Sequence, residues 1–232
     1  MTEAEWLAAD GPDPMLNFLN DRTSARKLRL FAVACCRRLG PLLCDDASYR
    51  QAVDVAEQFA EGLRTEKQRS AARSALTGWI EQSTFGRVLT DTAKAALKKD
   101  AIDAALDAGR GAAQSIMWSF RDATPAVGQD EEASHSASYT ALLGEENQQV
   151  RLLRDIFGNP FRPITFSPEW LTDTVVSLVK GMYESRDFNA MPILADALQD
   201  AGCDQEELLT HCRGNGPHVR GCWVVDLVLG KE

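Results

Sequence analysis

The sequence predicts an all-α protein, built either as an irregular multi-helix bundle or as stacked helical hairpins, and three observations support this prediction. Apolar residues recur at the 3.6-residue period of a helix rather than at the two-residue period of a strand. Alanine is abundant and runs of β-branched residues are rare. Glycine and proline fall mainly between the periodic segments. Only residues 162–166 have a strand-like pattern.

The N-terminal half of the chain shows helix start and stop signals in sequence. Short helices are expected at 3–9 and 14–19, separated by a Gly-Pro break. Thr23 or Ser24 is a suitable cap for a helix that runs to about residue 39, where Gly40-Pro41 ends it. Further helices are expected at 45–62, 65–79 and 90–108, with residues 111–120 extending the last one beyond two glycines.

Residues 122–137 contain almost no large apolar side chain and therefore predict an exposed linker or loop. This segment would divide the chain into an N-terminal helical unit, 1–121, and a C-terminal helical unit, 138–232. One bundle with an inserted loop also fits the pattern. In the second half, helices are expected at 139–157, 168–185, 191–201, 204–212 and 217–229.

Composition limits the function classes. The 232 residues are 44% hydrophobic and 25% charged, which is ordinary for a folded chain. A net charge of −9 argues against non-specific binding of nucleic acid or an anionic membrane by the whole surface. The longest apolar run, residues 30–36, is far shorter than the ~20 residues of a membrane helix. Because no basic-then-apolar segment opens the chain, we expect no secretory signal and a cytoplasmic location.

A stripe of arginines is expected on the helix that begins near Ser24 and on the residues just before it. At 100° per residue Arg22, Arg26, Arg29 and Arg37 share one face, opposite the apolar face of the helix. The stripe is either a solvated face paired with the surplus carboxylates of the chain or a docking surface for phosphate or an acidic partner. The second interpretation makes a nucleic-acid-associated or regulatory module an alternative function.

A Cys/His cluster lies near the C-terminus, at Cys203, His211, Cys212, His218 and Cys222. Zinc takes four nitrogen or sulfur ligands in a tetrahedron, and His218 and Cys222 would share a face if they lay one turn apart on the last helix. The spacing lacks a Cys-x2-Cys pair and fits no common zinc finger. The alternative is that the cysteines pack in the core. We therefore expect no cofactor, with zinc at this cluster as the alternative, and a zinc-dependent protein or enzyme is a second alternative function.

The run from Trp223 to Leu229 is apolar apart from Asp226, which suits a central helix. We expect Trp223 to be buried and Asp226 to have a structural role with an arginine partner, since an isolated buried charge is very costly.

Three stretches resemble one family: RKLRLFAVACCRR at 26–38, DIFGNPFRP at 155–163 and PHVRGCWVVD at 217–226. They are similar to an uncharacterised paralogous family expanded in planctomycete bacteria. The resemblance implies a bacterial cytoplasmic protein and implies no activity, so it assigns no functional residue.

The sequence contains no phosphate-binding loop, no complete metal-ligand motif and no evident nucleophile with its base. We therefore expect no catalytic residue and a non-enzymatic helical protein that mediates protein–protein interaction.

Overall fold

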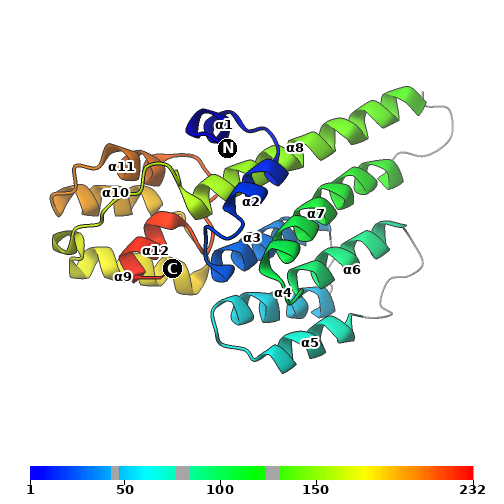
Figure 1. The fold of residues 1–232 in the computed structure, drawn as a ribbon, viewed down its shortest axis with the longest axis horizontal. Coiled ribbons are helices and arrows are strands. Elements are labelled where there is room, and N and C mark those ends of the chain that lie inside the picture. Colours follow the sequence, from blue (N-terminus) through cyan, green and yellow to red (C-terminus); the bar gives the residue numbers. More distant parts are fainter. Residues whose placement is uncertain (43–46, 77–83, 124–130, 232) are drawn as a thin grey trace. The chain divides into compact units, whose positions relative to one another are not determined.

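The computed structural model describes residues 1–42, 47–76, 84–123 and 131–231 (Figure 1). Over these residues helices are the only regular secondary structure, which confirms the all-α prediction. The chain forms two compact units, an N-terminal unit, Met1–Val150, and a C-terminal unit, Arg151–Glu232. Among the described helices, none combines the length and the apolar character needed to cross a bilayer.

The N-terminal unit packs around two helices, α3 (Ala25–Arg38) and α7 (Ala101–Ala123), which lie side by side (Figure 1). The α3 helix is buried along its whole central part, which is why its sequence is apolar on more than one face. The remaining elements are α1 (Glu3–Ala8), α2 (Pro12–Leu19), η1 (Gly40–Leu42), α4 (Ala47–Ala60), α5 (Glu66–Ala75), α6 (Thr84–Ala96) and most of α8 (Glu131–Phe157).

Side-chain caps fix the beginnings of several helices. The Ser24 hydroxyl accepts a hydrogen bond from the Lys27 amide at the start of α3. Thr65 and Gln68 form a reciprocal capping box at the start of α5. These caps satisfy amides that have no partner inside the helix, so the helices begin where the sequence predicts.

The long helix expected at 90–108 is instead two helices. The α6 helix ends at Ala96 and α7 begins at Ala101, where the Asp100 carboxylate accepts hydrogen bonds from the Ile102 and Asp103 amides. The helix then continues through Gly109 and Gly111. A Cβ at Gly111 would lie 3.1 Å from the Thr92 Cβ, so this glycine permits close packing of α6 and α7 rather than a break.

The linker expected at 122–137 is wrong over residues 131–137, which belong to α8, and over residues 122–123, which end α7. Residues 124–130 lie outside the described part of the chain. The linker was predicted because this segment has almost no large apolar side chain. Glu and Ala favour a helix even without such side chains. Acidic residues at a helix N-terminus are further stabilised by the helix dipole. The division between the two units falls at Val150, inside α8.

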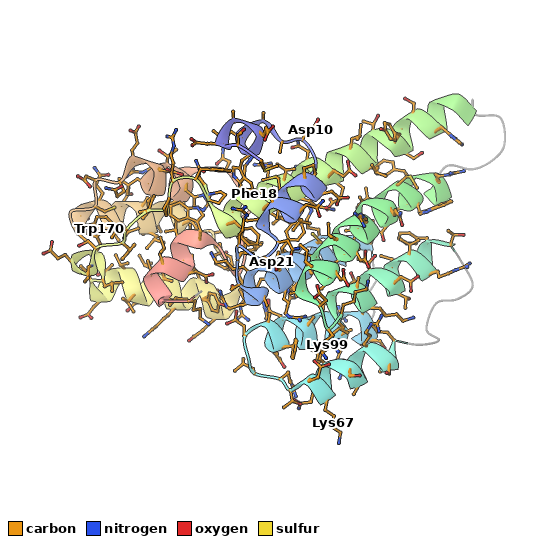
Figure 2. All side chains as sticks on the ribbon, in the orientation of Figure 1. Asp10, Phe18, Asp21, Lys67, Lys99 and Trp170 are labelled. Atoms are coloured by element: carbon orange, nitrogen blue, oxygen red, sulfur yellow. The ribbon has the colours of Figure 1, made fainter. Side chains whose placement is uncertain are left out.

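The C-terminal unit contains the end of α8, η2 (Pro168–Trp170), α9 (Asp173–Ser185), α10 (Met191–Asp200), α11 (Glu206–Arg213) and α12 (Trp223–Leu229). The α9 helix packs against α10 and α12, and α10 packs against α11. Their shared core includes Val175, Val179, Leu194 and Val224, and Trp170, labelled in Figure 2, lies at its edge, 8% exposed.

The helix expected at 217–229 begins only at Trp223, and residues 214–222 form a loop. Gly221 has a φ of 94°, a left-handed conformation that ends any helix approaching from Pro217. The strand-like residues 162–166 form no strand. The loop at 214–222 positions the site described below.

Candidate functional site

Two of the predicted arginines are paired with acidic side chains of their own unit. Arg26 contacts Glu61 with a 3.0 Å nitrogen–oxygen distance, and Arg37 contacts Asp54 at 2.8 Å and Glu57 at 3.1 Å. The Glu57 side chain is almost fully buried. These contacts join α3 to α4 and to the turn that follows it.

The other two arginines lie against aromatic rings. Arg29 is buried, its guanidinium donates to the carbonyl oxygens of Lys98 and Lys99, and it stacks over Phe59. Figure 2 labels Lys99 just beyond the end of α6. Arg22 lies 4.8 Å from the centre of the Phe18 ring. The stripe therefore has partners inside the N-terminal unit, which favours the interpretation of a paired face over that of a docking surface.

The C-terminal unit brings four potential ligand side chains together: Asp155, His211, His218 and Cys222. One ligand atom from each lies within 4.8 Å of all the others. Asp155 is in the last turn of α8, His211 in the last turn of α11 and His218 in the loop 214–222. Cys222 caps the start of α12. We refer to these four residues as the Asp/His/His/Cys cluster.

Asp155 is the centre of this cluster. Its Oδ1 lies 2.7 Å from Nδ1 of His218 and 3.2 Å from Nε2 of His211. Its Oδ2 accepts a hydrogen bond of 3.0 Å from the Val219 amide. The same nitrogen of His211 lies 3.3 Å from Sγ of Cys222. One carboxylate is therefore fixed on both oxygens and faces two imidazoles.

The net pKa shift is opposite for the two acidic groups of the cluster, downward for Asp155 and upward for Cys222. Burial would raise the pKa of Asp155, but hydrogen bonds and charge from His211 and His218 outweigh it, so the pKa is lowered. Burial raises the pKa of the Cys222 thiol well above its usual value, and the nearby Asp155 carboxylate raises it further. Without a cation the cluster therefore holds a carboxylate and a protonated thiol.

The arrangement differs from a Cys–His–Asp catalytic triad. In a triad the nucleophile and the carboxylate contact opposite nitrogens of the imidazole. Here Cys222 and Asp155 both approach Nε2 of His211. In addition, Cys222 is fully buried, and a thiol with a raised pKa is a poor nucleophile. Convergence of several donors on one point is instead typical of a metal site.

Three of the five residues proposed from the sequence belong to the cluster, and two do not. Cys203 and Cys212 lie in the apolar core of the unit, where burial raises the pKa of Cys212 to about 12. Sequence reasoning missed Asp155, which is 63 residues from His218. It lies in DIFGNPFRP, one of the three stretches that carry the family resemblance, and this resemblance was the sequence feature that pointed to the segment.

Trp223 fixes one side of the cluster. It is buried, and its ring centre lies 5.1 Å from that of His211. Gly158, which follows α8 with a φ of 62°, lies so close that a Cβ there would be 3.1 Å from the Trp223 ring.

Asp226 of α12 is buried, with 1% of its surface exposed. The arginine partner expected for Asp226 stays a prediction.

A second feature of the C-terminal unit is an open groove of about 700 Å³ between α9 and α10. The α9 side presents mainly small residues, and Ile193 of α10 is 58% exposed at the groove. A Cβ on Gly181 would meet no atom within 4 Å. The residues along the α9 side are Thr174, Ser177, Leu178, Gly181, Met182 and Ser185.

The chain was compared with models of protein families, with curated proteins and with solved structures, and none of them matches it. The resemblance to the planctomycete family remains a prediction from the sequence.

Proposed function

We propose that this chain is a non-enzymatic helical protein that binds another protein through the groove between α9 and α10, in the bacterial cytoplasm. The observation that carries the proposal is the exposure of Ile193 beside a stripe of small side chains on α9. Leu178, Met182 and Ile193 together give the groove an apolar lining, and such a groove suits the apolar face of a partner helix.

Gly181 supports a macromolecular partner. A glycine inside a helix costs about 1 kcal/mol relative to alanine, and neither its backbone angle nor crowding requires it here. The absence of a side chain at this exposed position would allow the backbone of a partner helix to approach α9 closely. An open groove also suits a helix better than a small molecule, which needs an enclosed pocket.

The buried cysteines are consistent with a non-enzymatic function. Cys212 and Cys222 are both fully buried with raised thiol pKa values, so neither is activated as a nucleophile. The Asp/His/His/Cys cluster is also closed, because its most exposed side chain, that of His211, is only 18% exposed.

Photo-crosslinking followed by reconstitution tests the proposal. A photoreactive residue at position 193 should form a specific adduct with a protein in cells that express the chain. The same residue at Leu171, which is 42% exposed but outside the groove, should form none. The purified partner should then bind Ile193→Glu at least ~10-fold more weakly than the wild type, and Leu171→Glu within ~2-fold of it. Equal adducts at both positions, or an unchanged affinity of Ile193→Glu, would refute the proposal.

A further inference from the structure

We propose that Asp155, His211, His218 and Cys222 bind one zinc ion and form a structural metal centre in the C-terminal unit. This inference concerns a different part of the unit from the α9–α10 groove and does not depend on protein binding.

The first support is geometric. A tetrahedral zinc ion with ligand bonds of about 2.0–2.3 Å places its ligand atoms about 3.3–3.7 Å from one another. The distances from Nε2 of His211 to Asp155 Oδ1 and to Cys222 Sγ are 3.2 and 3.3 Å. The 2.7 Å distance between Asp155 and His218 is that of a hydrogen bond. Zinc would replace the proton of that bond and separate the two atoms by about half an ångström.

The second support is charge. With zinc bound, Asp155 and Cys222 would each contribute one negative charge, and the two histidines would be neutral ligands. The sum neutralises a divalent cation, so the buried centre carries no net charge. This matters because an uncompensated charge in a buried site is very costly. Binding would release the thiol proton of Cys222 to solvent.

The third support is the position of one nitrogen of His211 between two other ligand atoms. Nε2 of His211 faces both a carboxylate and a thiol, although a neutral imidazole nitrogen either donates or accepts and cannot do both. In the cluster alone, one N–H of His211 must therefore be shared between the carboxylate and the sulfur, whereas a cation at its centre would contact the nitrogen, the oxygen and the sulfur directly.

The donor set identifies the metal class. Imidazole and thiolate ligands favour zinc and related transition metals, while calcium and magnesium take oxygen ligands. Four protein ligands fill the tetrahedron and leave no position for a substrate, which is the pattern of a structural site. The Val219 amide donates to the Asp155 carboxylate and orients it, and Arg151 donates to the Asn215 carbonyl. Two residues of α8 therefore hold the loop 214–222 at two points.

Cobalt titration of the full-length, metal-free protein tests the proposal. Tetrahedral Co²⁺ absorbs visible light much more strongly than hydrated Co²⁺, and a thiolate ligand adds a charge-transfer band in the near ultraviolet. We expect both signals to saturate at one ion per chain and to disappear when zinc is added. Cys222→Ser should abolish the charge-transfer band and weaken binding by at least ~100-fold. Cys212→Ser, a change of an equally buried cysteine outside the cluster, should keep the band.

Two further measurements keep the test decisive if Cys222→Ser fails to fold. Asp155→Asn keeps the size of the side chain but removes its charge, and it should retain the thiolate band with a weaker affinity. Native mass spectrometry of wild-type protein, purified without chelator from zinc-containing medium, should show one zinc per chain. Absence of bound zinc together with a Co²⁺ spectrum that lacks the thiolate band would overturn the proposal. The same band in Cys222→Ser as in the wild type would also overturn it.

Discussion

At the scale of single residues, buried charges in both units have identifiable partners. Asp155 accepts from two imidazoles and one amide, and Arg69 donates to Glu66 and to the Leu97 carbonyl while its guanidinium stacks on Phe59. Removing one partner of a buried charge leaves the other unsatisfied, so such residues should dominate the response of stability to mutation and pH.

Asp155 should make the metal-free protein sensitive to acid. Its pKa in the folded state is lowered, whereas an unfolded aspartate titrates near ~3.9. The carboxylate therefore stabilises the fold above that pH, and the stabilisation is lost as the pH falls through the lower folded-state pKa. In urea unfolding between pH 3 and 6 with a chelator, Asp155→Asn should show a weaker decline at low pH than the wild type.

Asp196→Asn is the control for this experiment, because it removes the same charge from an exposed carboxylate. It should follow the wild-type pH dependence. If Asp155→Asn did the same, the contacts of Asp155 with the histidines would contribute nothing to the fold.

Arg69 should contribute strongly to the stability of the N-terminal unit. It is buried on α5 and its guanidinium donates to the carbonyl of Leu97, just after α6. Arg69→Ala should lower the free energy of unfolding by about 2–3 kcal/mol, measured by urea denaturation. Arg73→Ala is a matched control, because Arg73 lies on the same helix, is exposed and donates to the Lys94 carbonyl. It should have a much smaller effect, and equal losses would contradict this interpretation.

At the scale of elements, the end of α8 holds the cluster in position. Gly158 and Gly230 both have a φ of 62°, but only Gly158 lies against another side chain, that of Trp223. Gly230→Ala should therefore cost only the backbone strain, about 1–2 kcal/mol. Gly158→Ala should cost about 1–3 kcal/mol more, because Trp223 must move. Thermal unfolding of the two variants compares these costs. Equal losses of stability would show that Trp223 can move away from position 158 without cost.

Local signals in the sequence predicted most helices, because capping is a local interaction. Ser24 and Thr65 each begin a helix as expected. The helix expected at 168–185 is interrupted, because a three-residue 3-10 turn follows Ser167 and α9 begins only at Asp173, after Thr172. Signals that depend on packing were misinterpreted. The segment 90–108 was taken as one helix although α6 ends at Ala96 and α7 begins at Ala101, and the loop before Trp223 was taken as a helix.

The candidate site could be predicted only in part. Two histidines and one cysteine are close in sequence, which drew attention to the region. Asp155 joins them only through the packing of α8 against the loop 214–222, and this contact leaves no trace in residue spacing. The roles of Cys203 and Cys212 likewise depend on which face of each helix meets the core, which spacing alone left open.

At the scale of the whole molecule, the metal centre lies within one of two compact units, so its effects should be confined to that unit. In hydrogen exchange, removal of metal with a chelator should increase exchange of amides in α11, α12 and the loop between them. Amides of α3 and α7 in the N-terminal unit should exchange at unchanged rates. A uniform increase over both units would indicate that the two units unfold together, and no increase would indicate that metal does not stabilise the fold.

The most direct measurement is X-ray absorption spectroscopy at the zinc edge of the full-length protein purified without chelator. The proposed centre predicts one sulfur ligand at about 2.3 Å and three nitrogen or oxygen ligands at about 2.0–2.1 Å. Two or more sulfur ligands would place Cys203 or Cys212 at the metal, against the structure. Six oxygen or nitrogen ligands without sulfur would show that zinc binds elsewhere, and would contradict the centre formed by Asp155, His211, His218 and Cys222.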